Sequence, residues 1–291
     1  MFRGSIVALI TPFRNGSVDE ASLRELIEWQ IAEGTHGFVP TGTTGESPTL
    51  SHDEHDRVIE LAIEVVDGRR PVIAGTGSNS TDEAIRLTAH AQKAGADAAL
   101  IVTPYYNKPT QEGLYAHYRA IHDATDIPII IYNIPGRSVV DMTPATMARL
   151  AELPRIAGVK DSSGDIVRPL ETSARCGEDF CQLTGEDGNV IGFLAHGGAG
   201  AISVTANVAP RLCSEMHVAW QEGRHGDALA IQKKLLPLHA ALFSETSPGP
   251  IKYAVSRLGR CADELRLPMV NATAACRDRV DAAMVHAGLV N

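Results

Sequence analysis

The sequence of 291 residues has few cysteines, few aromatic residues and no long hydrophobic run. Its five cysteines are an odd number and form no C-x-x-C pair, which argues against a disulfide framework or a zinc ribbon and favours a reducing compartment. No apolar stretch approaches the roughly 18 residues needed to cross a bilayer. The apolar N-terminal segment runs into a turn at residues 12–16 without a signal-peptide cleavage pattern. We therefore expect a cytoplasmic protein that spans no membrane.

Positive charge is also scarce. The chain has 26 Lys and Arg against 35 Asp and Glu, for a formal net charge of −9. Its basic residues are scattered singly and offer no positive face to a phosphate backbone, so nucleic-acid binding is not expected. The remaining composition, 44% hydrophobic and 21% charged, is that of a folded domain.

Short apolar runs alternate with stretches of helical periodicity. The runs lie at residues 5–10, 37–39, 72–74, 98–102, 129–132, 156–159, 182–183 and 201–204. This alternation predicts a parallel sheet covered by helices, and eight repeats favour a (β/α)8 barrel, an α/β TIM barrel, over an open doubly wound sheet. Strand signals stop after Asn207, so we expect a catalytic barrel at residues 1–224 and a C-terminal helical domain at 225–291.

Several residues mark helix ends. Ser51 with Glu54, and Ser80 with Glu83, fit the capping box, and Pro144 fits a first helical position. Glycines placed to end three helices stand just before expected strands, at Gly34, Gly68 and Gly95.

Lys160 directly follows the expected strand at 156–159, and Tyr132 ends the strand before it. In a barrel these positions lie at the catalytic mouth, where burial favours the neutral amine that forms an imine. A phenol beside that amine is suited to proton relay. An ion pair of Lys160 with Asp161 or another carboxylate is the alternative.

Other strand exits carry groups suited to carboxylates. Thr43 and Thr44 lie between glycines, so their backbone N–H groups are candidates for binding a carboxylate, with an ordinary glycine turn as the alternative. Arg137 follows Pro-Gly and is either a bidentate carboxylate ligand or a solvated surface residue. His52 and His55 lack the His-Glu-x-x-His spacing of zinc proteases, which disfavours metal binding there.

Taken together, the motifs resemble one family along the whole chain. The strings GSIVALITPF, GTTGESPTLSHDEH, PVIAGTGSNST, VTPYYNKPTQEGLY, IIIYNIPGRS, GVKD, GAGAISVTANVAP, RLPMV and HAGL are similar in order and spacing to the pyruvate-dependent class I aldolase and lyase superfamily, whose type member is dihydrodipicolinate synthase. The resemblance implies that Lys160 forms an imine with pyruvate. It also implies a proton relay of Tyr132, Thr43 and Tyr106, with Tyr106 supplied by a neighbouring subunit.

The same resemblance implies further partners and roles. Thr43 and Thr44 would hold the pyruvate carboxylate, Arg137 would receive the carboxylate of L-aspartate 4-semialdehyde, and the backbones of Gly185 and Ile202 would line the pocket. No metal, nucleotide or organic cofactor is implied. The family usually forms a homotetramer built as a dimer of dimers, and its reaction belongs to lysine and diaminopimelate biosynthesis.

Feedback inhibition by L-lysine is a further implication. The matching positions are Ser47, His52, His55, Asn79, Glu83 and Tyr105. Pro48 stands where some sensitive members have alanine, which leaves the strength of inhibition open.

One motif departs from many synthases. Asp161-Ser162-Ser163 replaces an acid followed by Ala-Thr or Ala-Ser, and similar runs occur in sugar-acid aldolases. A 2-keto-3-deoxy sugar-acid aldolase or an N-acetylneuraminate lyase is therefore the alternative activity. A metal-dependent barrel enzyme and a non-catalytic binding protein are two further alternatives.

Overall fold

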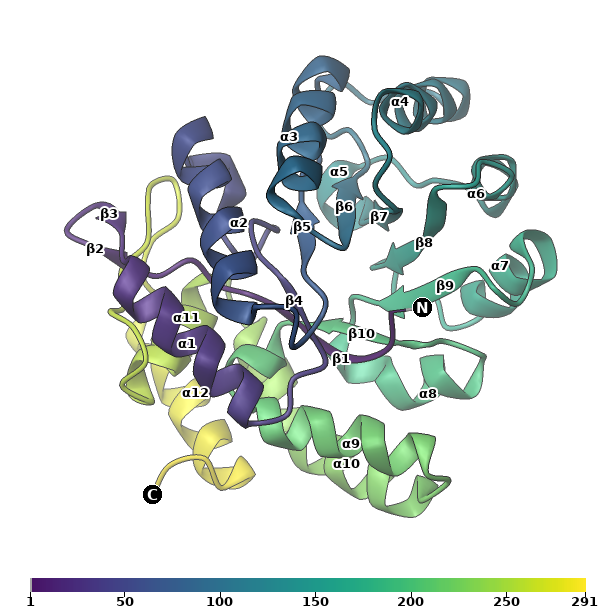
Figure 1. The fold of residues 1–291 in the computed structure, drawn as a ribbon. Coiled ribbons are helices and arrows are strands. Elements are labelled where there is room, and N and C mark those ends of the chain that lie inside the picture. Colours follow the sequence, from purple (N-terminus) through teal and green to yellow (C-terminus); the bar gives the residue numbers. More distant parts are fainter. Residues whose placement is uncertain (1) are drawn as a thin grey trace.

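The computed structural model describes residues 2–291 and contains one large parallel sheet. Its eight strands run in the order β4-β1-β10-β9-β8-β7-β6-β5, and a bridge between Phe38 and Val72 brings β4 beside β5. The sheet thus closes on itself, with helices around it (Figure 1). The expected (β/α)8 barrel is confirmed. Its strands are β1 (Gly4–Ala8), β4 (Gly37–Val39), β5 (Ile73–Gly75), β6 (Ala98–Val102), β7 (Ile129–Asn133), β8 (Ile156–Asp161), β9 (Cys181–Thr184) and β10 (Gly200–Ser203).

The outer layer of the barrel is helical. Its helices are α1 (Glu20–Ala32), α2 (His52–Val66), α3 (Thr81–Ala94), α4 (Gln111–Ala124), α6 (Pro144–Ala151), α7 (Arg168–Cys176), α8 (Val190–Ala195) and α9 (Pro210–Gln221). Short helical turns follow several strands, namely η1 (Ser47–Thr49), α5 (Pro135–Ser138), η2 (Asp187–Asn189) and η3 (Thr205–Asn207). Within the described residues, no helix combines the length and hydrophobicity that a membrane span requires.

A small antiparallel hairpin, β2 (Phe13–Arg14) with β3 (Ser17–Val18), follows β1 and was not predicted as strands. Its turn residues, Asn15 and Gly16, have φ angles of 55° and 80°. These positive angles are typical of the tight hairpin turn that an Asn-Gly pair favours. The turn itself was expected at this place.

Most predicted strand limits hold to within one or two residues, and the runs at 37–39 and 98–102 match fully. The largest functional difference is at β7 and β8, which continue past their apolar runs to Asn133 and Asp161. Tyr132 pairs with Lys160 and Asn133 with Asp161 across these strands. Lys160 therefore lies inside β8 instead of just after it, because the polar side chains that follow bond one another and extend the pairing.

The helix-end signals are confirmed with one exception. The Ser51–Glu54 capping box is complete, and Pro144 is the first residue of α6. At α3 only half of the box forms: the Ser80 side chain accepts from the Glu83 backbone, while the Glu83 carboxylate turns to other partners. The three expected glycines follow their helices with positive φ angles, Gly34 at 89°, Gly68 at 66° and Gly95 at 99°.

Helices α10 (His225–Leu242), α11 (Gly249–Arg257) and α12 (Ala274–Ala287) form the C-terminal region. In Figure 1, α10 lies beside α9, and the chain ends just beyond α12. One hydrophobic cluster includes Ile6 of β1, Leu235 of α10 and Val280 of α12. The barrel and these helices therefore share a core, and a domain division at residue 224 stays a prediction.

Candidate active site

Lys160 and Tyr132 lie side by side at the carboxyl ends of β8 and β7. Lys160 is only 6% exposed, and its Nζ lies 4.1 Å from the centroid of the Tyr132 ring. The structure records no ion pair for Lys160 among residues 2–291, and Asp161 instead pairs with Arg168, at 3.3 Å from its Nε. The alternative of a Lys160–Asp161 ion pair is therefore wrong, because successive residues of a strand point to opposite faces.

A cavity of about 410 Å³ opens beside this pair. Thr43, Tyr132 and Arg137 line it together, although Thr43 follows β4 while Tyr132 and Arg137 come from β7 and the turn after it. Lys160, Thr44, Gly185 and Ile202 are not part of the lining. An arrangement of hydroxyls and one guanidinium around a cavity of this size suits a small acidic molecule.

The Thr43–Thr44 loop is fixed by residues that the sequence interpretation missed. Glu46, two residues later, forms an ion pair with Lys252 of α11 at 2.5 Å, and the two side chains are 1% and 0% exposed. Lys252 also donates to the backbone oxygen of Glu264 at 2.8 Å, and the backbone N–H of Arg266 donates to Glu46 at 3.1 Å. Burial lowers the pKa of Lys252, and the Glu46 carboxylate opposes this shift. No local sequence pattern predicts this ion pair, because Glu46 and Lys252 lie far apart in the chain.

Gly185 follows β9 and lies against the lysine. A Cβ atom at Gly185 would fall 1.8 Å from Ser162 Oγ and 2.9 Å from Lys160 Cε, so any larger residue would force these two side chains to shift. The next residue, Glu186, was also missed as a site residue. Burial raises the pKa of the Glu186 carboxyl, Asp187 adds to this effect, and Lys160 opposes it. A perturbed carboxyl near a buried lysine is a signature of functional sites. Ile202 is fully buried within β10.

The residues expected to bind a regulatory lysine lie largely on the same cavity. Its lining includes Ser47, His52, His55, Glu83 and Tyr105. The Glu83 carboxylate lies 2.8 Å from His52 Nε2 and accepts from Ser78. Asn79 donates to the backbone oxygen of Tyr105 at 3.2 Å, next to the cavity.

Two members of this region differ sharply in exposure. His55 Nε2 lies 3.0 Å from the Gly75 backbone oxygen, and burial lowers the pKa of His55 to about 4, so its imidazole is neutral at pH 7. Tyr106 is 90% exposed and has a φ angle of 72°. Its ring therefore projects from the chain instead of joining Tyr132 and Thr43. A positive φ is uncommon for a bulky residue, and backbone strain of this kind is often found at functional sites.

Eight parallel strands with a buried lysine and tyrosine at the carboxyl ends of two neighbours place the chain in the class of (β/α)8 barrel proteins, whose active sites lie at this end of the strands. Comparison with known proteins narrows this class. The model of the dihydrodipicolinate synthetase family matches residues 1–287. The chain belongs to that family, and it is a lyase.

Individual relatives are similar to this chain over its full length. A 4-hydroxy-tetrahydrodipicolinate synthase of Rhodospirillum centenum is 68% identical over 290 residues, covering 100% of each chain. The dihydrodipicolinate synthase of Acinetobacter baumannii, solved in complex with pyruvate, is 44% identical with a TM-score of 0.97 over 100% of each chain. The DHDPS of Cyanidioschyzon merolae with lysine bound is 36% identical, with a TM-score of 0.96 over 99% of each chain.

Proposed function

We propose that this chain is a 4-hydroxy-tetrahydrodipicolinate synthase, which condenses pyruvate with L-aspartate 4-semialdehyde in the diaminopimelate route to lysine. The names of its full-length relatives support this activity over that of a sugar-acid aldolase or a neuraminate lyase. The observation that carries the proposal is the buried Lys160 amine packed on the Tyr132 ring, beside a cavity that Thr43 and Arg137 line. A biosynthetic role of this kind is expected in the cytoplasm.

The reaction begins at Lys160. Its neutral amine attacks the ketone carbon of pyruvate, and the resulting carbinolamine loses water to form the imine. Loss of a proton from the methyl carbon gives an enamine, whose carbon then bonds to the aldehyde carbon of the second substrate. The aldehyde oxygen takes up a proton. Attack of the substrate amino group on the imine carbon closes the ring and releases the Lys160 amine.

Other side chains are proposed to transfer the protons and to bind the substrate carboxylates. Tyr132, Thr43 and Tyr106 of a neighbouring subunit are proposed to relay protons between the carbinolamine and solvent. Backbone and hydroxyl donors of Thr43 and Thr44 would bind the pyruvate carboxylate, and the Arg137 fork would bind the carboxylate of the aldehyde. Gly185 and Ile202 would contribute backbone surface to the pocket.

Assembly and regulation are further parts of the proposal, and family membership supports them. We propose a homotetramer, a dimer of dimers, in which the ring of Tyr106, exposed in the single chain, enters the partner's site. L-lysine is proposed as a feedback inhibitor bound by Ser47, His52, His55, Asn79, Glu83 and Tyr105. The Glu83 carboxylate on the cavity wall is suited to an ammonium group.

Borohydride reduction in the presence of pyruvate tests the covalent step. We expect a pyruvate adduct in the intact mass, mapped to Lys160 by peptide analysis, and no adduct in Lys160→Met. An unmodified Lys160 would overturn the proposal and favour a non-catalytic binding protein.

Substrate choice is tested by offering pyruvate with a panel of aldehydes. Aspartate semialdehyde should be strongly preferred over glyceraldehyde and N-acetylmannosamine. Tyr132→Phe should retain the fold and lose about 100-fold or more in turnover, because the relay phenol is gone. A clear preference for a sugar aldehyde would contradict the proposed activity.

A further inference from the structure

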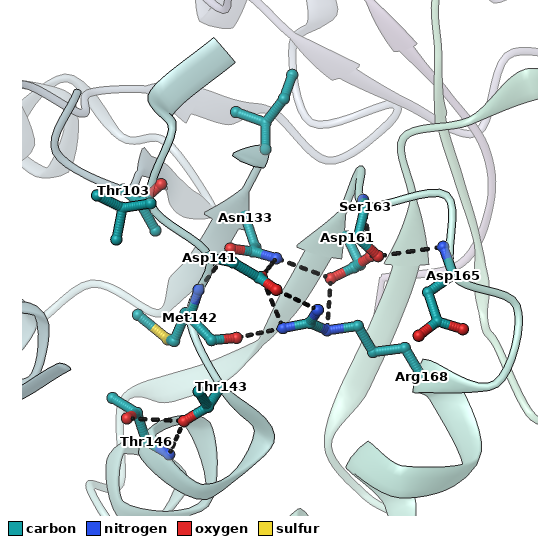
Figure 2. Close-up of polar contacts among 12 residues, drawn as sticks. Thr103, Asn133, Asp141, Met142, Thr143, Thr146, Asp161, Ser163, Asp165 and Arg168 are labelled. Atoms are coloured by element: carbon teal, nitrogen blue, oxygen red, sulfur yellow. Dashed lines mark hydrogen bonds and ion pairs between the residues drawn. The ribbon is translucent and has the colours of Figure 1, made fainter. Parts of the chain in front are cut away.

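Four polar side chains gather on the outer side of β7 and β8, and we call Asn133, Asp141, Asp161 and Arg168 the outer polar cluster (Figure 2). Successive strand residues point to opposite faces. Since Tyr132 lines the cavity and Lys160 packs on its ring, Asn133 and Asp161 point away from the barrel interior. The Asn133 amide joins them, donating to Asp161 Oδ2 at 3.1 Å and to Asp141 Oδ1 at 2.8 Å.

Arg168, the first residue of α7, links the cluster. Its guanidinium lies 2.8 Å and 2.9 Å from the two Asp141 oxygens, 3.3 Å from Asp161 Oδ2, and donates to the Met142 backbone oxygen. Figure 2 shows this one side chain reaching both carboxylates. Burial opposes the charge on Arg168, but Asp141 and Asp161 outweigh burial and raise its pKa.

The second oxygen of Asp161 is also occupied. Ser163 donates to Asp161 Oδ1 from its backbone N–H at 3.0 Å and from its hydroxyl at 2.5 Å. The Asp161 carboxylate is thus held from both sides, by Ser163 and by Arg168. Because Asp161 directly follows Lys160, this fixes the backbone that carries the lysine.

The cluster also reaches the segment that carries Arg137. That segment, residues 134–142, leaves β7 and returns through Asp141 and Met142, whose backbone N–H donates to Asn133 Oδ1 at 3.0 Å. Arg168 contacts both returning residues. Arg168 therefore connects the strand of Lys160 with the segment of Arg137, and Asn133 joins both carboxylates to the strand of Tyr132.

We infer that Arg168 is a positioning residue that aligns the imine-forming Lys160–Tyr132 pair with the carboxylate-binding Arg137. The inference rests on the proposed function. Two carboxylates around one largely buried guanidinium are an unfavourable choice for stability alone, since apolar side chains of similar volume are often as stable or more so. What such a cluster supplies is a fixed geometry, because a planar fork bonds several acceptors in set directions.

The test uses Arg168→Lys, which keeps the positive charge but replaces the fork with one ammonium. Two quantities are measured on the full chain: the rate at which pyruvate alone becomes trappable on Lys160 by borohydride, and the KM for aspartate semialdehyde. We expect trapping to slow and KM to rise, each about 10-fold or more. Arg175→Lys, at an exposed position in the last turn of the same helix, should leave both at wild-type values.

Asp141→Asn separates the two effects, since Asp141 belongs to the Arg137 segment and not to the lysine strand. It should raise the KM for the aldehyde while trapping with pyruvate stays near the wild-type rate. This variant also decides the matter if Arg168→Lys does not fold, and an unchanged KM in it would then overturn the inference.

Other outcomes are equally decisive. If Arg168→Lys only lowers the unfolding temperature and leaves trapping and KM intact, Arg168 is structural and the inference is wrong. If Arg168→Lys changes only one of the two quantities, Arg168 does not align both groups and the inference is wrong. Failure of the wild-type protein to trap pyruvate would overturn the proposed function, and the inference with it.

Discussion

The two sides of the barrel mouth hold their functional side chains in different ways. Behind Lys160 and Tyr132, the outer polar cluster shares one guanidinium between two carboxylates, and the Asp141 side chain remains 47% exposed. Behind Thr43 and Thr44, the single Lys252–Glu46 pair is sealed from solvent. The first side is a network of fixed geometry that water reaches at Asp141, and the second is a closed contact between distant parts of the chain.

This difference predicts whether a mutation mainly changes the stability of the fold or mainly changes the alignment of the site. An unpaired charge in a sealed site has no water to solvate it, so loss of a partner there destabilises the fold. A partly exposed charge is solvated when its partner is lost, so the free energy of unfolding changes little while the alignment of neighbouring groups changes more. The predictions below test this contrast, starting with the largest change in stability.

Lys252→Met should cause the largest loss, about 3–5 kcal/mol in the free energy of unfolding, because the Glu46 carboxylate is left buried without its partner. Urea unfolding at pH 7 measures it. The double variant Lys252→Met with Glu46→Gln removes both charges and should recover at least half of that loss. A double variant as unstable as the single one would contradict the role of the ion pair.

The second-largest effect should come from acid, which lowers the free energy of unfolding through His55, a buried residue on the same side of the barrel mouth as Thr43. The Gly75 backbone oxygen near His55 also accepts from the Thr41 hydroxyl. Burial holds the pKa of folded His55 at about 4, below the usual 6.5, so the unfolded chain binds the proton more readily. Its stability contribution is complete above pH 6.5 and is lost as pH falls to about 4, on the order of 3 kcal/mol.

Urea unfolding at pH 7 and pH 4 checks this contribution. Other buried histidines add to the total slope, so the informative quantity is the difference between the wild-type protein and His55→Gln. The variant should lose less stability over this range. An identical loss in both proteins would show that His55 contributes nothing.

Gly185→Ala tests the packing on the lysine side. The added methyl group overlaps Ser162 Oγ and crowds Lys160 Cε. We expect about 1–3 kcal/mol of destabilisation, together with slower trapping of pyruvate. Ser162→Ala in the same chain removes the closest contact and should restore part of both quantities, and no restoration would count against this packing.

Asp141→Asn should have the smallest effect on stability, below about 1 kcal/mol, because its carboxylate is half exposed. The measurement is again urea unfolding at pH 7. A loss as large as that of Lys252→Met would erase the contrast between the two sides of the mouth.

Much of the fold and part of the site were predictable from local patterns. Alternating apolar runs predicted the eight strands of the barrel, and the Ser51 cap and the glycines near helix ends placed several boundaries correctly. Motif resemblance led to the family. The positions after the predicted strands also identified Thr43, Tyr132 and Arg137 as candidate site residues, and these three line one cavity. These features were predictable because each depends on residues close together in the chain, or on one strand end.

Other features were decided by tertiary structure alone. The sequence places Asp161 next to Lys160, but strand geometry turns its side chain outward to Arg168. It shows no link between Glu46 and Lys252, which meet only when α11 packs against the loop after β4. Sequence alone determined which chemical groups stand at the barrel mouth, through periodicity and short motifs. Folding decided which of those groups pair, because side-chain partners are chosen by distance in space and by exclusion of water.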